Sequence, residues 1–381
     1  MKILIDLTSL YDHLSGIERY AKEISLSMLD TEPGHEYVLV FKNQIDKDFL
    51  RYTSASNVET IVLRTKMGGP IGKLLFGQLY LPIKLYQIKA DAYLFLAFPE
   101  PLLFFKSAIF STIHDMAAFD EGDTLKTFSR IYFKLSYYHA KLFAKRIITV
   151  SRFSANRICT ILKMPKKRIL IAFDGVESRR FIDRDVENGD LKAYGLPERY
   201  ALSLSTLEPR KNLVALLDAY ENLILKGIDL PDLVLAGRMG WKEDKLLEGY
   251  LDSLRQKVHL PGFIDDADIT KLYSNASYFI NTSKYEGFGI PPLEAMKCAT
   301  PVISSDIEAA REVLGDVPIF FDINNPRSLE DAIIKMEALL TDKGALLRMQ
   351  RAGIKRAKHF NWDYSAKRII CNMEKLYDHG R

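Results

Sequence analysis

Short apolar segments alternate with helical segments along the whole chain, and this alternation most strongly restricts the fold. The first series opens with the apolar run Lys2–Asp6, and a second series opens with Tyr200–Ser205. Strands that alternate with helices form parallel sheets with helices on both faces. A chain of 381 residues is also too long for one ordinary core. The sequence therefore predicts an α/β protein with two doubly wound domains.

The polar segment Asp174–Glu198 separates the two series and is the predicted linker. We place an N-terminal domain at residues 1–185 and a C-terminal domain at residues 186–359, both Rossmann-like. Ligands of parallel α/β sheets bind at the carboxyl ends of the strands. The predicted site is therefore a cleft across which the two domains face each other.

The stretch Asn281–Ser304 carries the strongest indication of a ligand. Glu286 and Glu294 stand on either side of a loop that contains Gly287 and Gly289 and runs into the start of a helix. N–H groups at a helix start and the helix dipole favour phosphate, whereas carboxylates accept hydrogen bonds from sugar hydroxyls. This pattern predicts a site for a phosphorylated, polyhydroxylated ligand.

Two adjacent cations, Arg210 and Lys211, follow a predicted strand and open a predicted helix, Lys211–Lys226. The helix dipole disfavours cations at this end. A pyrophosphate in front of the helix would remove the conflict, because both cations would pair with it. The alternative is an ordinary basic helix cap in contact with solvent.

Taken together, these segments resemble glycosyltransferase family 4, and in particular its bacterial mannosyltransferase-like members. The nucleotide-sugar half of the family is matched at Glu208–Asn212, Ala236-Gly237, Gly262-Phe263 and Glu286–Met296. The N-terminal half is matched at Gly16-Ile17, His114-Asp115 and Ser151–Ser154. The resemblance implies a GT-B fold, a retaining glycosyltransferase, and a last helix, about 360–381, that packs back on the N-terminal domain.

The resemblance also implies roles for individual residues. Glu286 would contact hydroxyls of the donor sugar, and Glu294 those of the ribose, while Arg210 and Lys211 hold the diphosphate. His114 would hydrogen-bond the donor sugar. The other residues expected around the nucleotide are Gly16, Glu208, Asn212, Gly237, Phe263, Phe288, Gly289 and Ile290. The alternatives are a solvent-exposed helix acid for Glu294 and a hydrogen-bonded histidine at a strand end for His114.

The implied reaction transfers a hexose from a nucleoside-diphosphate sugar to a saccharide or lipid-linked acceptor, in bacterial surface-polysaccharide biosynthesis. Mannose, glucose, galactose, N-acetylglucosamine and rhamnose remain open as the sugar. Attack from the leaving-group face and a glutamate nucleophile or base both remain open as mechanisms. The alternative function is a non-catalytic nucleotide-sugar-binding or scaffold subunit.

No cofactor or metal is expected besides the donor. The chain contains the D-x-D matches Asp183-Arg184-Asp185 and Asp266-Ala267-Asp268, which we interpret as structural because such matches are frequent and acids are ordinary at helix starts.

Basic residues concentrate in the N-terminal half, although the net charge is only +4. Residues 60–90 and 124–173 contain no Asp or Glu. These stretches favour contact with an anionic membrane surface, and the alternative is aromatic core residues beside solvent-exposed lysines. No nucleic-acid-binding motif is present, so nucleic acid is not an expected partner. We expect a cytoplasmic protein, or a peripheral one on the inner face of the cytoplasmic membrane.

Overall fold

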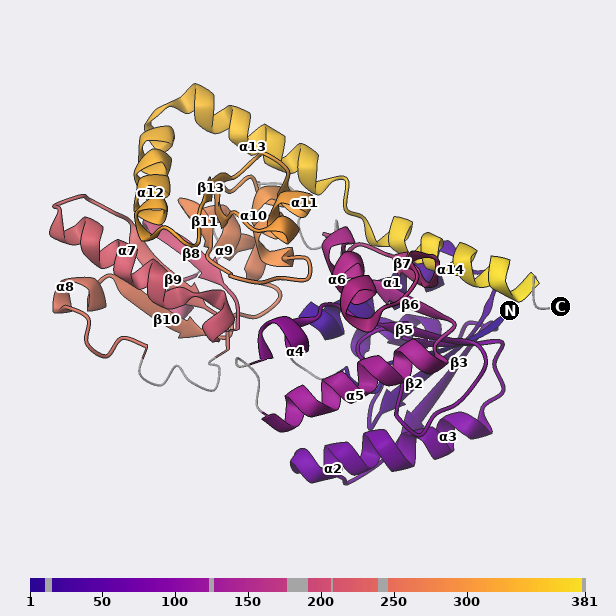
Figure 1. Cartoon of the computed structure of the whole chain (residues 1–381). Helices are drawn as coiled ribbons and strands as arrows, with labels where there is room; N and C mark the ends of the chain where they lie inside the picture. The colour runs from indigo at the N-terminus through magenta and orange to yellow at the C-terminus, as the bar shows by residue number, and fades with distance from the viewer. Residues whose placement is uncertain (11–15, 123–126, 177–190, 207, 239–245, 379–381) are drawn as a thin grey trace. The chain divides into compact units, whose positions relative to one another are not determined.

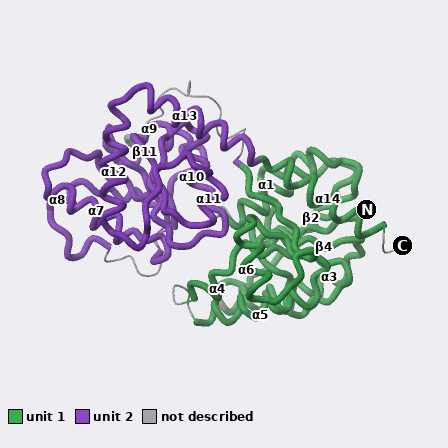
Figure 2. Tube along the Cα trace, turned by 45° about the horizontal axis from the view of Figure 1, so that its top comes forward, with its two compact units in different colours: residues 1–175, 361–381 green, residues 176–360 purple. Residues whose placement is uncertain are grey.

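The computed structural model describes residues 1–10, 16–122, 127–176, 191–206, 208–238 and 246–378. The chain forms two compact units, coloured separately in Figure 2. Unit 1 contains Met1–Gly175 and Asn361–Arg381, and unit 2 contains Val176–Phe360. The boundary predicted between residues 185 and 186 lies outside the described residues.

Unit 1 is built on a parallel sheet whose order, among its described strands, is β3-β2-β1-β4-β5-β6-β7. Its strands are β1 Lys2–Asp6, β2 Glu36–Lys42, β3 Val58–Leu63, β4 Ala92–Phe95, β5 Ile109–Thr112, β6 Arg146–Thr149 and β7 Ile169–Ile171. The apolar run Ile3–Ile5 is completely buried, as expected for a central strand covered on both faces. The α/β fold class is thereby confirmed for this half.

Helices cover both faces of the sheet in unit 1 (Figure 1). They are α1 Gly16–Thr31, α2 Gly69–Leu75, α3 Leu81–Gln87, α4 Ala117–Asp120, α5 Thr127–Phe143, α6 Arg152–Leu162 and α14 Trp362–Asp378. A π-helical segment, η2 Phe76–Tyr80, joins α2 to α3, and short 3₁₀ turns lie at η1 Lys47–Tyr52 and η4 Lys166–Arg168. Helix α14 packs on α1, although more than 300 residues separate them in the sequence.

Unit 2 also contains a parallel sheet, with the order β10-β9-β8-β11-β12-β13 among its described strands. These strands are β8 Tyr200–Leu204, β9 Asp232–Ala236, β10 Val258–Gly262, β11 Tyr278–Asn281, β12 Val302–Ser305 and β13 Ile319–Phe321. From β8 the chain adds β9 and β10 on one side of the sheet, and it then adds β11, β12 and β13 on the other side, so the strand order reverses between β8 and β11. In doubly wound sheets this switch point is where ligands bind, beyond the carboxyl ends of the strands.

The helices of unit 2 are α7 Leu213–Leu225, α8 Asp252–Arg255, α9 Ile269–Asn275, α10 Ile290–Lys297, α11 Glu308–Leu314, α12 Pro326–Thr341 and α13 Lys343–Ala357. The 3₁₀ turns η5 Leu191–Tyr194 and η6 Pro209–Lys211 precede β8 and α7. Two predicted positions need correction. Helix α7 begins at Leu213 and not at Lys211, because Asn212 takes a left-handed conformation that separates η6 from the helix. Gly16 is the first residue of α1 and does not lie in the loop before it.

Candidate active site

A small hollow lies at the switch point of the sheet in unit 2. The ends of β8 and β11 form it together with the loop after β11 and the start of α10. Its lining residues are Ser203, Leu204, Ser205, Lys211, Phe279, Asn281, Thr282, Ser283, Glu286 and Pro291. The Oγ atom of Ser205 is buried and has no hydrogen-bond partner in the structure. The hollow therefore combines carboxylate, ammonium, amide and hydroxyl groups at the position where doubly wound sheets bind ligands.

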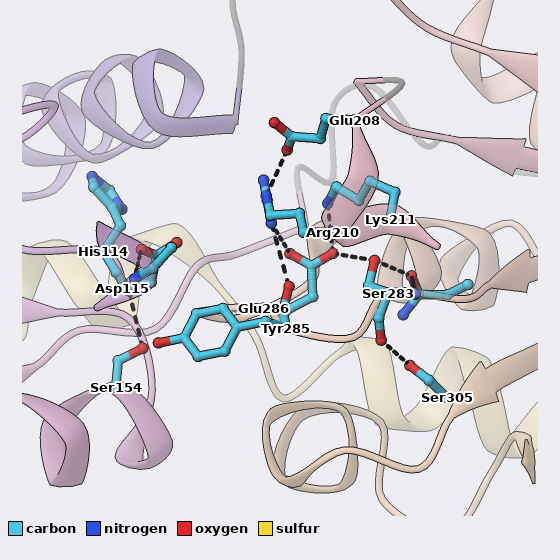
Figure 3. A network of polar contacts seen from close by, with 12 residues as sticks. His114, Asp115, Ser154, Glu208, Arg210, Lys211, Ser283, Tyr285, Glu286 and Ser305 are labelled. Atoms are coloured by element: carbon cyan, nitrogen blue, oxygen red, sulfur yellow. Dashed lines mark hydrogen bonds and ion pairs between the residues drawn. The ribbon is translucent and has the colours of Figure 1, made fainter. Parts of the chain in front are cut away.

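Glu286 is the centre of the polar network in this hollow (Figure 3). Its Oε1 accepts hydrogen bonds from Lys211 Nζ at 2.6 Å and from Ser283 Oγ at 2.7 Å. Its Oε2 accepts one from Arg210 Nη1 at 3.2 Å. Both cations predicted to hold the diphosphate therefore converge on one carboxylate.

Further hydrogen bonds fix the loop after β11 in place. Ser283 Oγ also lies 2.9 Å from Asn281 Oδ1, and Ser305 Oγ donates to the Ser283 carbonyl at 2.7 Å. Thr282 Oγ1 donates to the Lys211 carbonyl at 2.7 Å. These bonds join the ends of β11 and β12 to η6. They hold the cations and the carboxylate in one arrangement before any ligand binds, which lowers the cost of ordering the site.

The charges of the network are strongly coupled. Burial alone would raise the pKa of Glu286, but the charges of Lys211 and Arg210, with hydrogen bonds from Lys211 and Ser283, outweigh it and lower the pKa to about 2. Burial, assisted by the charge of Arg210, lowers the pKa of Lys211, and Glu286 opposes that change. The carboxylate is therefore ionised throughout the physiological range and is a weak base.

The charge of the paired cations is balanced by carboxylates of the protein itself, and their predicted contact with a diphosphate stays a prediction. Arg210 and Lys211 lie in η6, before α7, and Arg210 Nε also pairs with Glu208 Oε1 at 2.5 Å. The protein's own Glu208 and Glu286 therefore balance this charge without a phosphate. Asn212 acts here through its backbone, since φ is 56°, a conformation that asparagine tolerates better than most residues.

Gly237 and Phe263 lie at the carboxyl ends of β9 and β10. Gly237 has a φ of 131°, and a Cβ atom at this position would stand 1.9 Å from the Ser205 carbonyl oxygen. Only glycine fits there. The Phe263 ring is partly exposed, and the Arg238 guanidinium lies over it at 5.4 Å. The structure thus places both predicted residues at the same edge of the sheet as the hollow.

The loop before α10 matches the predicted strand, glycine loop and helix start. Gly289 is the N-cap of α10 with φ 88°, no side chain caps the helix, and Ile290 is its first residue. The first N–H groups of a helix have no partner within it. The Phe288 ring is buried against Phe360 at 5.3 Å, so its side chain belongs to the core of unit 2.

Glu294 is buried on α10 and is not a solvent-exposed helix acid. Its Oε2 accepts a hydrogen bond from the Tyr273 hydroxyl at 2.9 Å. The predicted contact of Glu294 with ribose hydroxyls stays a prediction.

His114 follows β5 in unit 1. Its Nε2 lies 2.9 Å from the Leu96 carbonyl oxygen, so Nε2 carries the proton and donates. Its own carbonyl accepts a hydrogen bond from Ser154 Oγ at 3.0 Å. Burial lowers the pKa of His114 to about 4, against opposing effects of Leu96, Glu18 and Ala97, so the ring is neutral at physiological pH. In that form Nδ1 is a hydrogen-bond acceptor. Gly16 lies at the start of α1 in unit 1, and its predicted contact with phosphate stays a prediction.

Of the two D-x-D matches, only the second lies within the described residues. Asp183 and Asp185 lie outside the described residues. Asp268 accepts a hydrogen bond from the Tyr194 hydroxyl at 2.7 Å and lies 3.8 Å from Lys271, which are structural contacts.

Within the described ranges, no helix combines the length and the apolar character needed to cross a bilayer.

Sequence reasoning missed the hydroxyl and amide groups that hold the network. Ser283 lies three positions before Glu286, so its presence in the same loop is its only sequence signal. Ser205, Ser305 and Tyr273 carry none, because the sheet brings them to the site from separate strands and helices.

Solved structures with the same overall fold extend over nearly the whole chain. The structure of Anabaena HepE in complex with UDP and glucose has a TM-score of 0.72 at 17% identity and covers 98% of this chain and 100% of that one. WaaG, a glycosyltransferase involved in lipopolysaccharide biosynthesis, has a TM-score of 0.69 at 14% identity and 99% coverage of both chains. The fold is therefore that of the two-domain GT-B glycosyltransferases, as predicted.

Sequence comparison identifies the family. The family model for glycosyl transferases group 1 matches residues 192–356. The O-antigen chain mannosyltransferase B of Escherichia coli is 32% identical over 270 residues, which are 70% of each chain. The Escherichia coli serotype-specific mannosyltransferase WbdA is 31% identical over 240 residues, but these are only 29% of that longer protein. The chain belongs to the group 1 glycosyl transferases, and the predicted family and enzyme class are confirmed.

Proposed function

We propose that this protein transfers mannose from a nucleoside-diphosphate donor, with GDP-mannose first among the candidates, to a saccharide or lipid-linked acceptor. The names of the similar O-antigen mannosyltransferases support the sugar and the setting, bacterial surface-polysaccharide biosynthesis. The transfer retains the anomeric configuration. The protein acts in the cytoplasm, at the inner face of the cytoplasmic membrane.

The observation that carries the proposal is the convergence of Arg210 and Lys211 on Glu286 at the switch point of unit 2. Negative charge grows on the leaving diphosphate during glycosyl transfer, and fixed cations stabilise it. The guanidinium has five N–H donors and the ammonium three, so both can contact phosphate oxygens as well as Glu286. Gly289 and Ile290 offer backbone N–H groups to the same phosphates, whereas Pro291 and Pro292 of the first turn of α10 have none.

The two possible mechanisms are attack from the leaving-group face and catalysis by a glutamate nucleophile or base. The charge of Glu286 favours the first. A carboxylate with a pKa of about 2 is a poor proton acceptor at neutral pH. Two cations also draw on the electron pairs that a nucleophile would need. We therefore assign the acceptor's proton to the leaving phosphate, and to Glu286 the positioning of the cations and of the donor sugar. Neither a metal ion nor a cofactor takes part in this scheme.

Unit 1 is assigned to the acceptor, with His114 directed at the donor sugar. Its neutral ring can accept a sugar hydroxyl at Nδ1 while Nε2 remains bound to Leu96.

Binding and turnover of the donor test the proposal. Thermal shifts with GDP-, UDP-, dTDP- and ADP-sugars would identify the nucleotide, since a ligand of the folded state raises the melting temperature. Arg210→Ala removes charge-assisted bonds to the diphosphate, so its affinity for the nucleotide should fall at least about tenfold. Its rate of mannose transfer should fall further.

Arg255→Ala is the matched control, because Arg255 is a half-exposed arginine of unit 2 on α8. It should keep the wild-type affinity. Unchanged nucleotide affinity in a folded Arg210→Ala protein would refute the role of the cations, and transfer with inversion would refute the stereochemistry.

A further inference from the structure

The hollow in unit 2 contains a hydroxyl group whose purpose the fold does not explain. Ser205 directly follows β8 and lines the hollow together with Lys211 and Glu286. Its Oγ is buried, yet it makes no hydrogen bond in the structure. A buried hydroxyl without a partner lowers the stability of the folded state, so a group of this kind at a candidate site indicates a ligand that it can bond.

The backbone holds Ser205 in this position. The Ser205 N–H donates to the Ala236 carbonyl of the neighbouring strand β9 at 3.0 Å. Gly237 allows the two strand ends to touch, because a Cβ atom there would stand 1.9 Å from the Ser205 carbonyl oxygen. The end of β8 is therefore packed tightly against the end of β9, and this packing fixes the serine at the edge of the hollow.

The other hydroxyls around the hollow already have structural tasks. Ser283 Oγ donates to Glu286, and Thr282 Oγ1 donates to the Lys211 carbonyl. Ser305 Oγ donates to the Ser283 carbonyl. Ser205 Oγ adds no bond to this network. A role in holding the site together therefore accounts for the other hydroxyls and not for this one.

The neighbouring charges indicate which group Ser205 would bond. Figure 3 shows Lys211 directed at Glu286, and Ser205 lines the same hollow as both. An ammonium attracts phosphate, whose oxygens only accept hydrogen bonds, and a serine hydroxyl can donate to them. Such a bond to an anion is stronger than one between neutral groups.

We propose that Ser205 is a donor-binding residue whose hydroxyl donates a hydrogen bond to the β-phosphate of the nucleoside-diphosphate sugar. This inference deepens the proposed function and rests on it. Negative charge grows on this phosphate as the glycosidic bond breaks, so the bond strengthens towards the transition state. The ligand-free protein then carries an unpaired hydroxyl that only the donor satisfies.

Ser205→Ala should have opposite effects on stability and on binding. It removes the unpaired hydroxyl from the ligand-free protein, so the free energy of unfolding in urea should stay the same or rise. It also removes a charge-assisted bond, so the affinity for GDP in calorimetric titration should fall at least about tenfold. A serine that served only the fold would show the reverse, with lower stability and unchanged affinity.

Two further variants separate the contact from packing. Ser111→Ala is the matched control, because Ser111 Oγ on β5 of unit 1 is likewise buried without a hydrogen-bond partner in the structure. It should resemble Ser205→Ala in stability and the wild type in affinity for GDP. Ser205→Cys fills the position but offers only a weak donor, so it should lose affinity as Ser205→Ala does.

The choice of ligand locates the contact on the donor. GMP lacks the β-phosphate, so Ser205→Ala should bind it as the wild type does. GDP-mannose keeps that phosphate, so its affinity should fall by the same factor as that of GDP.

Three results would overturn the proposal. The first is a less stable ligand-free Ser205→Ala protein with unchanged affinity for GDP, which would mean that water or protein satisfies the hydroxyl before binding. The second is a loss confined to GDP-mannose, which would put the contact on the sugar. The third is an equal loss of affinity in Ser111→Ala. A wild type without affinity for any nucleoside diphosphate would contradict the proposed function as well, whereas these three results contradict the contact alone.

Discussion

At the scale of single residues, Glu286 sets the electrostatics of the candidate site. Its carboxylate is nearly buried, yet it stays charged because Lys211, Arg210 and Ser283 all donate to it. A buried carboxylate without such partners would be neutral. The network therefore has two effects. It keeps a negative charge in the hollow, and it keeps Arg210 and Lys211 directed at one carboxylate.

The lowered pKa of Glu286 predicts an acid-sensitive contribution to stability. The pKa falls from 4.5 to about 2 on folding, so the folded state holds the proton less tightly than the unfolded state. The contribution is present above the unfolded pKa and is lost as the pH falls from about 5 towards 2. Urea unfolding from pH 7 to pH 3 should show a steeper loss of stability for the wild type than for Glu286→Gln. Parallel curves would contradict the assigned pKa.

At the scale of elements, the start of α6 positions the loop that carries His114. Ser151 caps α6 by accepting the Ser154 backbone N–H at 2.9 Å. Ser154 Oγ in turn donates to the His114 carbonyl. The ends of β5 and β6 are thus tied together through one helix cap, because the carboxyl ends of neighbouring parallel strands meet at the same edge.

Removal of this cap should destabilise unit 1 locally. Ser151→Ala leaves the Ser154 N–H without its acceptor and should lower the free energy of unfolding by about 1 kcal/mol. Ser107→Ala, at an exposed position outside any helix, is the control and should change it little. Denaturant titration followed by circular dichroism measures both, and equal stability of the two variants would contradict the role of the cap.

At the scale of the whole molecule, the end of the chain completes the first unit. Trp362 contacts Tyr20 of α1, with ring centroids 5.8 Å apart, and Ser365 Oγ donates to the Phe173 carbonyl at 2.7 Å. Gly175 lies so close to Trp362 that a Cβ atom would come within 2.6 Å of the Trp362 backbone nitrogen. The core of unit 1 therefore includes C-terminal residues, which are synthesised after unit 2.

The packing of α14 predicts how unit 1 responds to mutation. Ile369 on α14 is completely buried, so Ile369→Ala should cost about 2–4 kcal/mol. Tyr364 on the same helix is 62% exposed, and Tyr364→Ala should cost far less. Hydrogen exchange measured separately for the amides of each unit should show the loss of stability as faster exchange in unit 1, while the amides of unit 2 remain protected. Equal effects of the two substitutions would contradict the docking of α14.

The sequence was most informative where elements are local and strongly patterned. The apolar runs Lys2–Asp6 and Tyr200–Ser205 predicted β1 and β8, because strands inside a parallel sheet are covered on both faces. The structure added β7, Ile169–Ile171, which sequence reasoning missed because it is three residues long and directly follows the basic turn Lys166–Arg168. The start of α7 was wrong by two residues, since propensity does not reveal the left-handed Asn212.

The sequence by itself determined the class of fold and the family, and it predicted the segments of the candidate site, because strand and helix patterns and the Glu286–Met296 loop are local. The tertiary structure decided which groups meet. Arg210 and Glu286 are 76 residues apart and pair only because β8 and β11 are neighbours in the sheet. Because these strands are neighbours, the two cations that look unbalanced in the sequence form an ion-pair network with carboxylates. The packing of α5 likewise decided which of its two apolar sides is exposed. Pairing depends on distance in space, which a periodic pattern along one chain does not encode.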